Sequence, residues 1–285
     1  MFSTNGHARV GVVDGTTIAD VTSNRPDLPG DLLDWITLGA EALERLARLV
    51  DDAPRLNLAD VMLLAPIGRP AKFLGIGGNF ESHLAEVAHL GMTRPLHQIW
   101  FNKQTTCIAG PYDDIELPRV SSALDYEGEL AIVIGTRCRH VTPEDAPRVI
   151  AGFTICNDVS VRDWQFRSPT ATLGKSFDTH GPTGPWLVTS DELGDPHVLS
   201  LRTWVNGELR QSGNTAEMIF DCYKMIAELS TVFTLEPGDI LATGTPAGVG
   251  AVKSPPVYLV AGDVVRVEIQ GIGAIENHVV AEPEY

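Results

Sequence analysis

Short runs in which apolar and polar residues alternate recur along most of the chain, a pattern typical of β-strands. In 265–270 every second residue is apolar. Ala8–Val13 and Thr16–Val21 flank Asp14-Gly15, a dipeptide that favours a tight hairpin turn. Gln98–Ile134 contains strand-like runs and turn residues but no long helical periodicity. The pattern therefore predicts an antiparallel or mixed β architecture.

Helical spacing of apolar residues is confined to a few segments. Asp31 is a candidate N-cap, and the apolar residues after it are interrupted near Gly39, which predicts one broken helix or two short ones. Glu81–Glu86 is a run of good helix formers. The clearest helix is expected to begin at Asn214, which Glu217 follows at capping-box spacing, and to bury Met218, Ile219, Cys222, Ile226, Leu229 and Phe233.

The run Gly68-Arg69-Pro70 predicts a connection between two units. Residues 1–68 would form a small N-terminal unit of hairpin and helix, and residues 69–285 the main domain. A chain of 285 residues is long enough for one large core with such an appendage. Because strand patterns predominate, the predicted fold class is α+β, mainly β.

Composition and charge narrow the classes of function. With a formal net charge of −16 and no cluster of Lys and Arg, the chain is not expected to bind nucleic acid. A small anionic substrate is still compatible, because a metal ion and one lysine can reverse the sign of the local field. Residues 1–10 are polar and no apolar run reaches membrane-spanning length, so we expect no membrane contact and a cytoplasmic location.

The chain has four cysteines, and no two of them form a C-x-x-C pair. This scatter favours buried thiols in a reducing compartment over a disulfide framework or a zinc site. The four residues are Cys107, Cys138, Cys156 and Cys222.

Three carboxylates are the strongest candidates for chemistry. Glu127 and Glu129 stand two residues apart at the head of the apolar run Leu130–Ile134, so a strand would send both to one face. A second apolar run ends at Asp158, which a neighbouring strand could bring to the same place. Three converging carboxylates require a cation, and their hard oxygens suit Mg²⁺, Mn²⁺ or Ca²⁺. The alternative is that the glutamates lie on the wet face of an edge strand.

Other candidates carry less weight by themselves. His83 and Glu86 are three apart in a predicted helix, so their side chains would be neighbours, as many solvated surface pairs are. Lys175 lies in a loop and would be an ordinary surface lysine unless that loop faces the metal. Gly244–Gly250 is a loop whose amides could bind an oxyanion.

Several common motifs are excluded. Around Gly75–Phe80 the glycine spacing fails at Phe80, which argues against a dinucleotide site. The Gly244–Gly250 loop is not followed by the Lys and Ser/Thr of a P-loop. A G-x-S-x-G nucleophile elbow is also absent from the sequence, which disfavours a serine hydrolase.

Six motifs in one order give the sequence a family resemblance. They are Gly78-Asn79-Phe80 followed by His83 and Glu86, Asp125–Glu129, Asn157-Asp158, Arg162–Gln165, Gly174–Asp178 and Gly244–Gly250. Together they resemble the fumarylacetoacetate hydrolase family over about residues 72–280. The first seventy residues look like the family's more variable N-terminal unit. Phe80 stands where many relatives have tyrosine, so a hydroxyl contribution is missing there.

The resemblance implies a mixed β-sandwich roll with a small N-terminal α/β unit, usually paired as a homodimer. It makes 69–285 the catalytic domain and assigns metal binding, with Mg²⁺ or Mn²⁺ and with Ca²⁺ as an alternative, to the three carboxylates. It further implies that His83 and Glu86 position and deprotonate water on a mobile segment. The positions that contact substrate would be Gln165, Lys175 and Thr245.

The chemistry expected from this resemblance is hydrolysis of the C3–C4 bond of a 2,4-dioxo acid such as an acylpyruvate. A divalent cation would withdraw electrons from the bound acid, and water activated by Glu86 and His83 would attack C4. Lys175 and the amides near Thr245 would stabilise the developing negative charge. The products would be pyruvate and a carboxylic acid.

Other reactions are compatible with the same residues. Decarboxylation of oxaloacetate and isomerisation of a hydroxydienoate need the metal and an enolate but not the water. The His83 and Glu86 pair favours hydrolysis among these three. A non-catalytic metal- or metabolite-binding module is the alternative from another class, and the intact set of carboxylates, pair and lysine argues against it.

Overall fold

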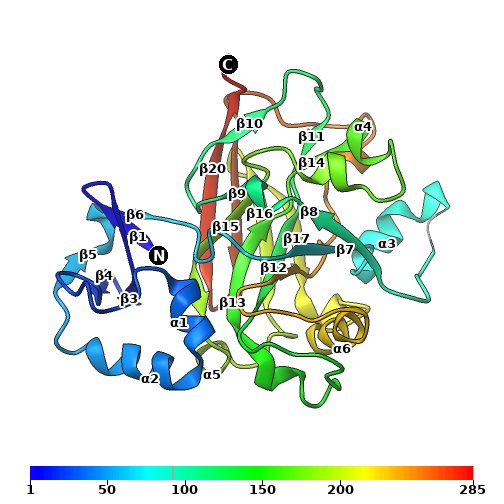
Figure 1. Ribbon diagram of the computed structural model, residues 1–285. Coiled ribbons are helices and arrows are strands. Elements are labelled where there is room, and N and C mark those ends of the chain that lie inside the picture. Colours follow the sequence, from blue (N-terminus) through cyan, green and yellow to red (C-terminus); the bar gives the residue numbers. More distant parts are fainter. Residues whose placement is uncertain (92, 285) are drawn as a thin grey trace.

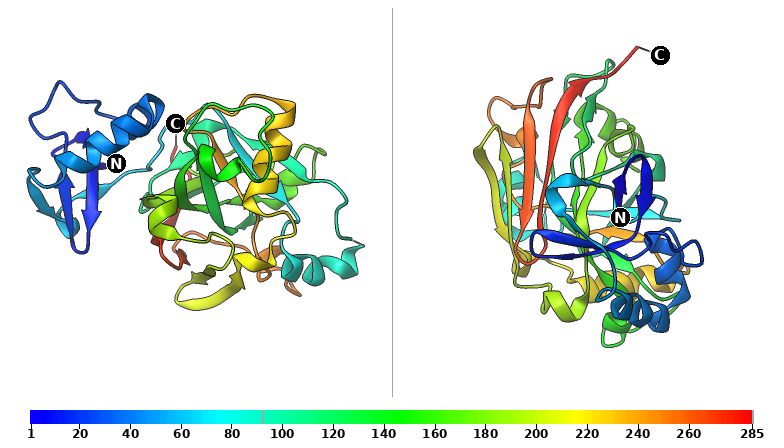
Figure 2. Two further views of the ribbon diagram at one scale, coloured as in Figure 1. Left: turned by 90° about the horizontal axis from the view of Figure 1, so that it is seen from below. Right: turned by 90° about the vertical axis from the view of Figure 1, so that its left-hand side faces the viewer.

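The predicted hairpin around Asp14-Gly15 forms from Gly11–Asp14 and Thr17–Asp20. An earlier hairpin of Phe2–Thr4 and His7–Arg9 precedes it, so the predicted strand Ala8–Val13 is divided between two hairpins. Both belong to an N-terminal unit that stands beside a larger β-rich body (Figures 1 and 2). The computed structural model describes residues 1–91 and 93–284. The N-terminal unit holds two three-stranded sheets. One has the order β2-β1-β6 and the other the order β3-β4-β5. Their strands are β1 Phe2–Thr4, β2 His7–Arg9, β3 Gly11–Asp14, β4 Thr17–Asp20, β5 Arg55–Asn57 and β6 Met62–Leu63.

The broken helix predicted after Asp31 forms as two helices, α1 (Leu32–Leu38) and α2 (Ala40–Leu49), which meet at Gly39. Asp31 is the N-cap of α1, and its carboxylate accepts a hydrogen bond from the amide of Leu33 at 2.9 Å. An N-cap of this kind satisfies an amide that the helix leaves without a partner.

The body is built on a mixed seven-stranded sheet of order β8-β7-β18-β12-β13-β15-β9. The pairs β7–β18 and β9–β15 are parallel, and the other neighbours are antiparallel. The central strand β12 is buried at every residue. The strands are β7 Phe73–Gly77, β8 Ile99–Lys103, β9 Ile108–Ala109, β12 Gly128–Ile134, β13 Ile150–Asn157, β15 Gly181–Val188 and β18 Ile240–Ala242.

A second sheet of five strands has the order β10-β20-β19-β16-β17 and packs across the first (Figure 1). Its strands are β10 Ile115–Leu117, β16 Ser200–Val205, β17 Glu208–Asn214, β19 Val264–Ile269 and β20 Gly273–Ala281. A short ribbon pairs β11 (Leu124–Asp125) with β14 (Ser160–Val161). The alternation in 265–270 is confirmed, because its apolar members are buried and the others are at least partly accessible. The architecture is α+β and mainly β, as predicted.

The main core lies between the two sheets and continues under helix α6 (Cys222–Val232). It joins Leu130 and Ile132 of β12 to Val267 of β19 and to Met225 and Ile226 of α6. A second cluster covers the other face of the large sheet. The remaining helices of the body are α3 Glu81–Val87, α4 Arg162–Gln165 and α5 Ser190–Leu193. The 3-10 turns are η1 Leu58–Asp60, η2 Ala88–Leu90, η3 Thr105–Cys107, η4 Ala146–Val149, η5 Thr172–Lys175, η6 Thr215–Glu217 and η7 Gly250–Val252.

The predicted start of the longest apolar helix is wrong by two turns. Asn214 and Glu217 do form a capping box, but it caps only the 3-10 turn η6. Helix α6 begins at Cys222, because Asp221 accepts hydrogen bonds from the amides of Tyr223 and Lys224. Met218 and Asp221, at the two ends of the segment between η6 and α6, have extended backbones. Within this segment the side chain of Asn79 bonds both the amide and the carbonyl of Phe220. A tertiary contact thus overrides the local helical pattern.

The N-terminal unit contacts the body through apolar side chains. Ile36 of α1 and Ile67 pack in the same cluster as Phe73 and Ile240 of the large sheet. The strands before and after residue 68 therefore belong to different sheets, but one apolar cluster contains residues from both sides. A domain boundary at residue 68 stays a prediction. All four cysteines are free and buried, as expected. Among the residues described, no helix has the length and apolar character needed to cross a membrane.

Candidate active site

The three predicted carboxylates come together at one end of strands β12 and β13. Glu127 precedes β12, Glu129 is its second residue, and Asp158 follows β13, which pairs with β12 so that Gly128 lies opposite Asn157. One oxygen from each carboxylate lies within 4.8 Å of the others. Their exposures are 7%, 1% and 0%, so the alternative of a wet strand face is wrong.

The glycine between the two glutamates is needed for this packing. A Cβ atom at Gly128 would lie 2.3 Å from Oγ1 of Thr203 on the second sheet. Real Cβ atoms do not approach other atoms so closely, so a larger residue would push β12 away from β16. Only glycine lets both neighbouring glutamates sit on a strand that is covered by the second sheet.

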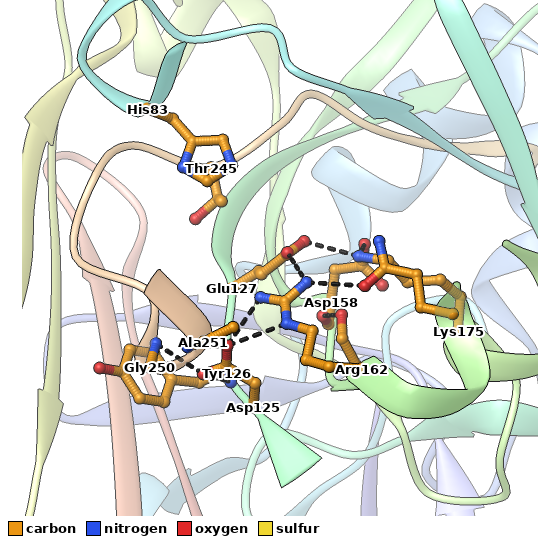
Figure 3. A network of polar contacts seen from close by, with 12 residues as sticks. His83, Asp125, Tyr126, Glu127, Asp158, Arg162, Lys175, Thr245, Gly250 and Ala251 are labelled. Atoms are coloured by element: carbon orange, nitrogen blue, oxygen red, sulfur yellow. Dashed lines mark hydrogen bonds and ion pairs between the residues drawn. The ribbon is translucent and has the colours of Figure 1, made fainter. Parts of the chain in front are cut away.

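Lys175 is part of the same cluster, not a surface lysine. Its ammonium donates to Oε2 of Glu127 at 2.7 Å and to Oδ2 of Asp158 at 2.6 Å, and the side chain is 2% exposed. The loop that carries it folds inward as the turn η5, which packs against α4. Figure 3 shows Glu127 between Lys175 and Arg162.

Two further cations complete the cluster, and neither was predicted as a site residue. Lys103, the last residue of β8, donates to Oδ1 of Asp158 at 2.6 Å and to the carbonyl of Lys175. Arg162 donates from Nη1 to Oε1 of Glu127 at 2.6 Å. Lys103, Arg162 and Lys175 therefore supply from within the protein much of the positive charge that the three carboxylates require.

The three carboxylates differ in their ion pairing with these cations. Burial alone would raise the pKa of Glu127, but Lys175 and Arg162 outweigh burial and hold that pKa below its usual range. Burial, with the charges of Asp158 and Glu127, raises the pKa of Glu129 well above its usual range. Among the described residues no side-chain cation pairs with Glu129, whose carboxylate accepts from the amide of Gly244 at 2.7 Å.

This donor set fits a divalent cation. Three hard carboxylate oxygens converge, and in the described part of the chain one of the three carboxylates, Glu129, has no side-chain cation as a partner. A small, hard ion with oxygen ligands would supply the charge that Glu129 lacks. Glu127, Glu129 and Asp158 would hold it.

The predicted pair on helix α3 forms above the carboxylates. Nδ1 of His83 lies 3.2 Å from Oε2 of Glu86, and both side chains are partly exposed. The other oxygen of Glu86 accepts from the amide of Gly248 at 2.9 Å. In the view of Figure 3 His83 lies above Glu127, and His83, Thr245 and Lys175 line one cavity.

The amides of the Gly244–Gly250 loop serve the protein's own carboxylates. Gly244 donates to Glu129, Gly248 to Glu86, and Gly250 to Asp125 at 2.8 Å. The predicted role of this loop, binding negative charge on the substrate, is therefore not available to these three amides. These amides orient the carboxylates, and those three N–H groups are not free for a substrate.

Besides Lys175, the other two of the three predicted substrate contacts differ in what they can offer. Gln165 accepts from Nη1 of Arg162 at 2.9 Å through its oxygen, which leaves its NH₂ group for a ligand. Thr245 donates its hydroxyl proton to the carbonyl of Gly128 at 2.9 Å and accepts from Gln211 at 2.7 Å. The hydroxyl of Thr245 thus has both a hydrogen-bond acceptor and a donor within the protein.

A cavity of about 450 Å³ opens over these groups. Its polar lining includes Glu127, Glu129, Lys175, His83 and Gln165. Most of the remaining wall is apolar, with contributions from α3, β7 and β8, namely Ile76, Leu84, Val87, Ile99, Trp100 and Phe101. Such a cavity, with few polar groups in an apolar wall, has the size and character of a small-molecule site.

Residues 72–280 match the family described as fumarylacetoacetate (FAA) hydrolase C-terminal. The chain belongs to the fumarylacetoacetate hydrolase family. It is similar to an oxaloacetate tautomerase of Xenopus laevis, described as mitochondrial, with 43% identity over 270 residues that cover 94% of this chain and 84% of the relative. The family resemblance inferred from the six motifs is confirmed.

Solved structures of the family share its architecture. A fumarylacetoacetate hydrolase from psychrophilic Exiguobacterium antarcticum is 42% identical, with a TM-score of 0.86, and the match covers 99% of this chain and 98% of that one. A maleylpyruvate hydrolase from Sphingobium sp. SYK-6, in complex with manganese(II) and pyruvate, is 33% identical with a TM-score of 0.83, over 99% and 98% of the two chains. The predicted family fold is confirmed.

Within this family fold, the structure brings together all eight predicted site residues. The ones that sequence reasoning missed are Lys103, Arg162 as an ion-pair partner, and the buried Asp125 that pairs with it. Arg162 and Asp125 stood inside two of the six motifs and could have been singled out there. Lys103 is the last residue of β8, and a lysine at a strand end gives no signal that it is buried.

Proposed function

We propose that this chain is a divalent-metal-dependent enzyme that moves a proton at C3 of a small anionic 2-oxo acid. The first reaction to test is interconversion of the keto and enol forms of oxaloacetate. The observation that carries the proposal is that His83, Glu127 and Glu129 line one cavity. The choice of oxaloacetate is supported by the relative named as an oxaloacetate tautomerase, at 43% identity over 94% of this chain.

The metal would be Mg²⁺ or Mn²⁺, with Ca²⁺ as an alternative, held by Glu127, Glu129 and Asp158. The manganese(II) ion in the maleylpyruvate hydrolase complex supports a small divalent cation such as Mn²⁺. When bound, the cation would act as a Lewis acid that polarises the 2-oxo group. The apolar wall of the cavity would exclude water from the reacting atoms.

Three side chains would orient the substrate. The ammonium of Lys175 has three donors, of which two go to Glu127 and Asp158, so one remains for a substrate oxygen. The free NH₂ group of Gln165 would donate to the substrate's carboxylate. Thr245 lines the same cavity, and since its hydroxyl is engaged with Gly128 and Gln211, it would contribute shape and its methyl group.

His83 would move the proton. If Glu86 accepts from the Nδ1–H group, the imidazole is the tautomer whose Nε2 carries a lone pair. Nε2 would then take the proton from C3 of the keto acid and pass it to the 2-oxo oxygen, which gives the enol, and the reverse transfer restores the keto form. The carboxylate of Glu86 stabilises the imidazolium that forms in between.

Hydrolysis of the C3–C4 bond of a 2,4-dioxo acid is the second candidate. The same His83 and Glu86 pair favours it, because Nε2 could instead take a proton from water as the water attacks C4. Cleavage would place the bonding electrons on C3, which then gains a proton to give pyruvate, and C4 leaves as a carboxylic acid. The structural similarity to a maleylpyruvate hydrolase also supports this candidate.

One set of assays separates these activities. Purified protein is supplied with oxaloacetate, with acylpyruvates of graded size and with a hydroxydienoate, in EDTA and after addition of Mg²⁺ or Mn²⁺. Enol absorbance reports tautomerisation, and pyruvate release reports cleavage or decarboxylation. We expect metal-dependent loss of enol oxaloacetate without pyruvate release. Pyruvate release from an acylpyruvate at a higher kcat/KM would favour the second candidate, and no metal-dependent turnover of any of these acids would refute both.

His83→Ala tests the proposed proton carrier. We expect tautomerisation to fall by about 100-fold or more, the usual contribution of a general base. His278→Ala is the matched control, because this substitution removes an imidazole that is exposed on β20 and does not line the cavity. Equal activity of the two variants would rule out the role of His83.

Two further expectations concern the whole molecule. We propose a homodimer, which light scattering at micromolar concentration would contradict if it returned the mass of one chain. A cytoplasmic location is the other expectation, and fractionation of the source cells would test it, since the animal relative is described as mitochondrial.

A further inference from the structure

Asp125 is a buried carboxylate whose hydrogen bonds join three separate segments of the site. It is 0% exposed and precedes Glu127 by two residues. Oδ1 accepts from the amides of Tyr126 and Gly250 at 3.0 and 2.8 Å. Oδ2 accepts from the amide of Ala251 and from Nε of Arg162, both at 2.9 Å. Asp125 thus connects its own strand, the turn η7 and helix α4 (Figure 3).

The first consequence concerns Arg162. Nε and Nη2 of its guanidinium face Asp125, at 2.9 and 2.8 Å from Oδ2. The remaining nitrogen, Nη1, donates to Oε1 of Glu127 and to Oε1 of Gln165. A guanidinium is planar and rigid, so a carboxylate that holds one edge also sets the direction of the other. Asp125 therefore determines where Glu127 and Gln165 point.

The second consequence concerns the loop that holds Glu86. Asp125 accepts from Gly250 and Ala251, and the hydroxyl of Tyr126 donates to the carbonyl of Gly248 at 2.9 Å. The amide of the same Gly248 donates to Glu86. The approach is close, because a Cβ at Gly250 would lie 2.7 Å from Oδ1 of Asp125 and 2.0 Å from the carbonyl oxygen of Val257. The loop is thus held against the strand that leads to the metal ligands.

We propose that Asp125 is a positioning residue that orients the metal ligand Glu127 through Arg162 and, together with Tyr126, holds the loop that orients Glu86. The inference rests on the proposed function for the identity of the metal ligands. Asp125 itself does not line the cavity, whereas Arg162, Gln165 and Glu127 do. Its effect on binding and catalysis would therefore pass through these neighbours.

Asp125→Asn tests the first arm. The substitution keeps the shape but replaces one acceptor oxygen by an NH₂ group that repels its donors. Mn²⁺ affinity of the metal-stripped protein is measured by calorimetry, with no substrate present. We expect the Kd for Mn²⁺ to rise by about 10-fold or more, the usual effect of removing a residue that orients a metal ligand.

Asp239→Asn is the matched control. Asp239 is also 0% exposed, and its carboxylate accepts from the amide and ammonium of Lys72 and from the amide of Glu236, at 2.8–2.9 Å. It lies outside the cavity lining. We expect it to lose stability without a change in Mn²⁺ affinity. An unchanged Kd in Asp125→Asn, or an equal change in Asp239→Asn, overturns the inference.

A double-mutant cycle tests the path through Arg162, and Arg162→Lys alone keeps the inference testable if Asp125→Asn is poorly folded. Arg162→Lys retains the charge but loses the rigid fork, so it should weaken Mn²⁺ binding on its own. If Asp125 acts through Arg162, adding Asp125→Asn to Arg162→Lys changes Kd by less than twofold. Additive losses would mean that Asp125 acts independently, which overturns the inference.

Tyr126→Phe tests the second arm. It removes the hydroxyl bond to Gly248 but touches neither Arg162 nor Glu127. We expect kcat to fall severalfold with Mn²⁺ affinity unchanged, and a normal kcat overturns this arm. If the wild-type protein binds no divalent cation, the proposed function fails and the inference fails with it. If the wild type binds Mn²⁺ and Asp125→Asn binds it equally well, only the inference fails.

Discussion

The ammonium of Lys103 lies 2.6 Å from Oδ1 of Asp158, and neither side chain is accessible to solvent. Asp158 thus sits between Lys103 and Lys175, one on each carboxylate oxygen. Burial, the largest single cause, would lower the pKa of Lys103, but the charge of Asp158, its hydrogen bond and the nearby thiols together outweigh burial and raise that pKa. A buried ion pair of this kind is costly to break from one side, because the remaining charge has no water to solvate it.

Lys103→Met should therefore destabilise the protein by about 3–5 kcal/mol, the range for removal of one partner of a buried pair. Urea unfolding in EDTA measures this loss without a contribution from metal. Lys72→Met is the control, since Lys72 also pairs with a buried aspartate, Asp239, but is itself 27% exposed. We expect a smaller loss there. A loss in Lys103→Met no larger than in the control would contradict the account.

Glu129→Gln should stabilise the metal-free protein at neutral and higher pH. The pKa of Glu129 is raised in the folded state, so the folded protein binds more protons than the unfolded chain above pH about 4.3. Stability of the wild type in EDTA therefore falls as pH rises from that value through the folded pKa. The glutamine variant lacks this loss.

Urea unfolding across pH 5 to 8 checks this, and Mn²⁺ should reverse the order of the two proteins because it binds the wild type more tightly. A variant that is less stable than the wild type in EDTA at pH 8 would contradict the assigned charge on Glu129.

His180 should make the fold sensitive to mild acid. Burial lowers its pKa to about 4, and its Nε2 lies 2.8 Å from the carbonyl oxygen of Glu116, so the ring is neutral in the fold. The unfolded chain takes up a proton near pH 6.5, and stability is lost as pH falls from 6.5 to about 4. The loss can reach about 3 kcal/mol at 1.36 kcal/mol per pKa unit.

The difference between the wild type and His180→Gln measures this contribution, because glutamine can keep the bond to Glu116 without titrating. The variant should lose less stability than the wild type between pH 6.5 and 4. His278→Gln, at an exposed position, should follow the wild type. Parallel pH curves for the wild type and His180→Gln would refute the prediction.

Thr245→Val should affect stability more than substrate binding. The hydroxyl of Thr245 donates to Gly128 and accepts from Gln211, and valine removes both bonds while keeping the methyl surface of the cavity wall. Loss of a buried hydrogen-bonding group costs about 1–3 kcal/mol. We expect that loss in thermal unfolding, with KM within twofold of wild type. Thr245→Ser should restore stability, and a large rise in KM for valine alone would show direct substrate contact.

Much of the local structure followed from the sequence alone. The hairpin at Asp14-Gly15, the break at Gly39 and the strands around Glu129 all depend on neighbouring residues, since turn preference, capping and side-chain alternation act over a few positions. The motif order also identified the family, because it records residue types at defined separations along the chain. The fold class and the three converging carboxylates could be predicted on these grounds.

Local rules failed where two distant segments compete for one group. The capping box at Asn214 is real, yet the contact of Asn79 with Phe220 ends the turn and moves the helix start to Cys222. No rule of spacing relates Asn79 to Phe220, because the two residues are joined only by the packing of β7 against the rest of the body.

The tertiary structure alone decided how the charge of the site is balanced. The meeting of Glu127, Glu129 and Asp158 could be predicted from the sequence, since two stand two residues apart at the head of one strand and the third ends its neighbour, but burial was needed to exclude a wet strand face. Only the fold could bring Lys103 from an edge strand and Arg162 from a short helix to the same oxygens. Burial then makes these pairs strong and leaves Glu129 as the carboxylate without a cation, because charges in a site without water must be matched by whichever groups the packing brings near.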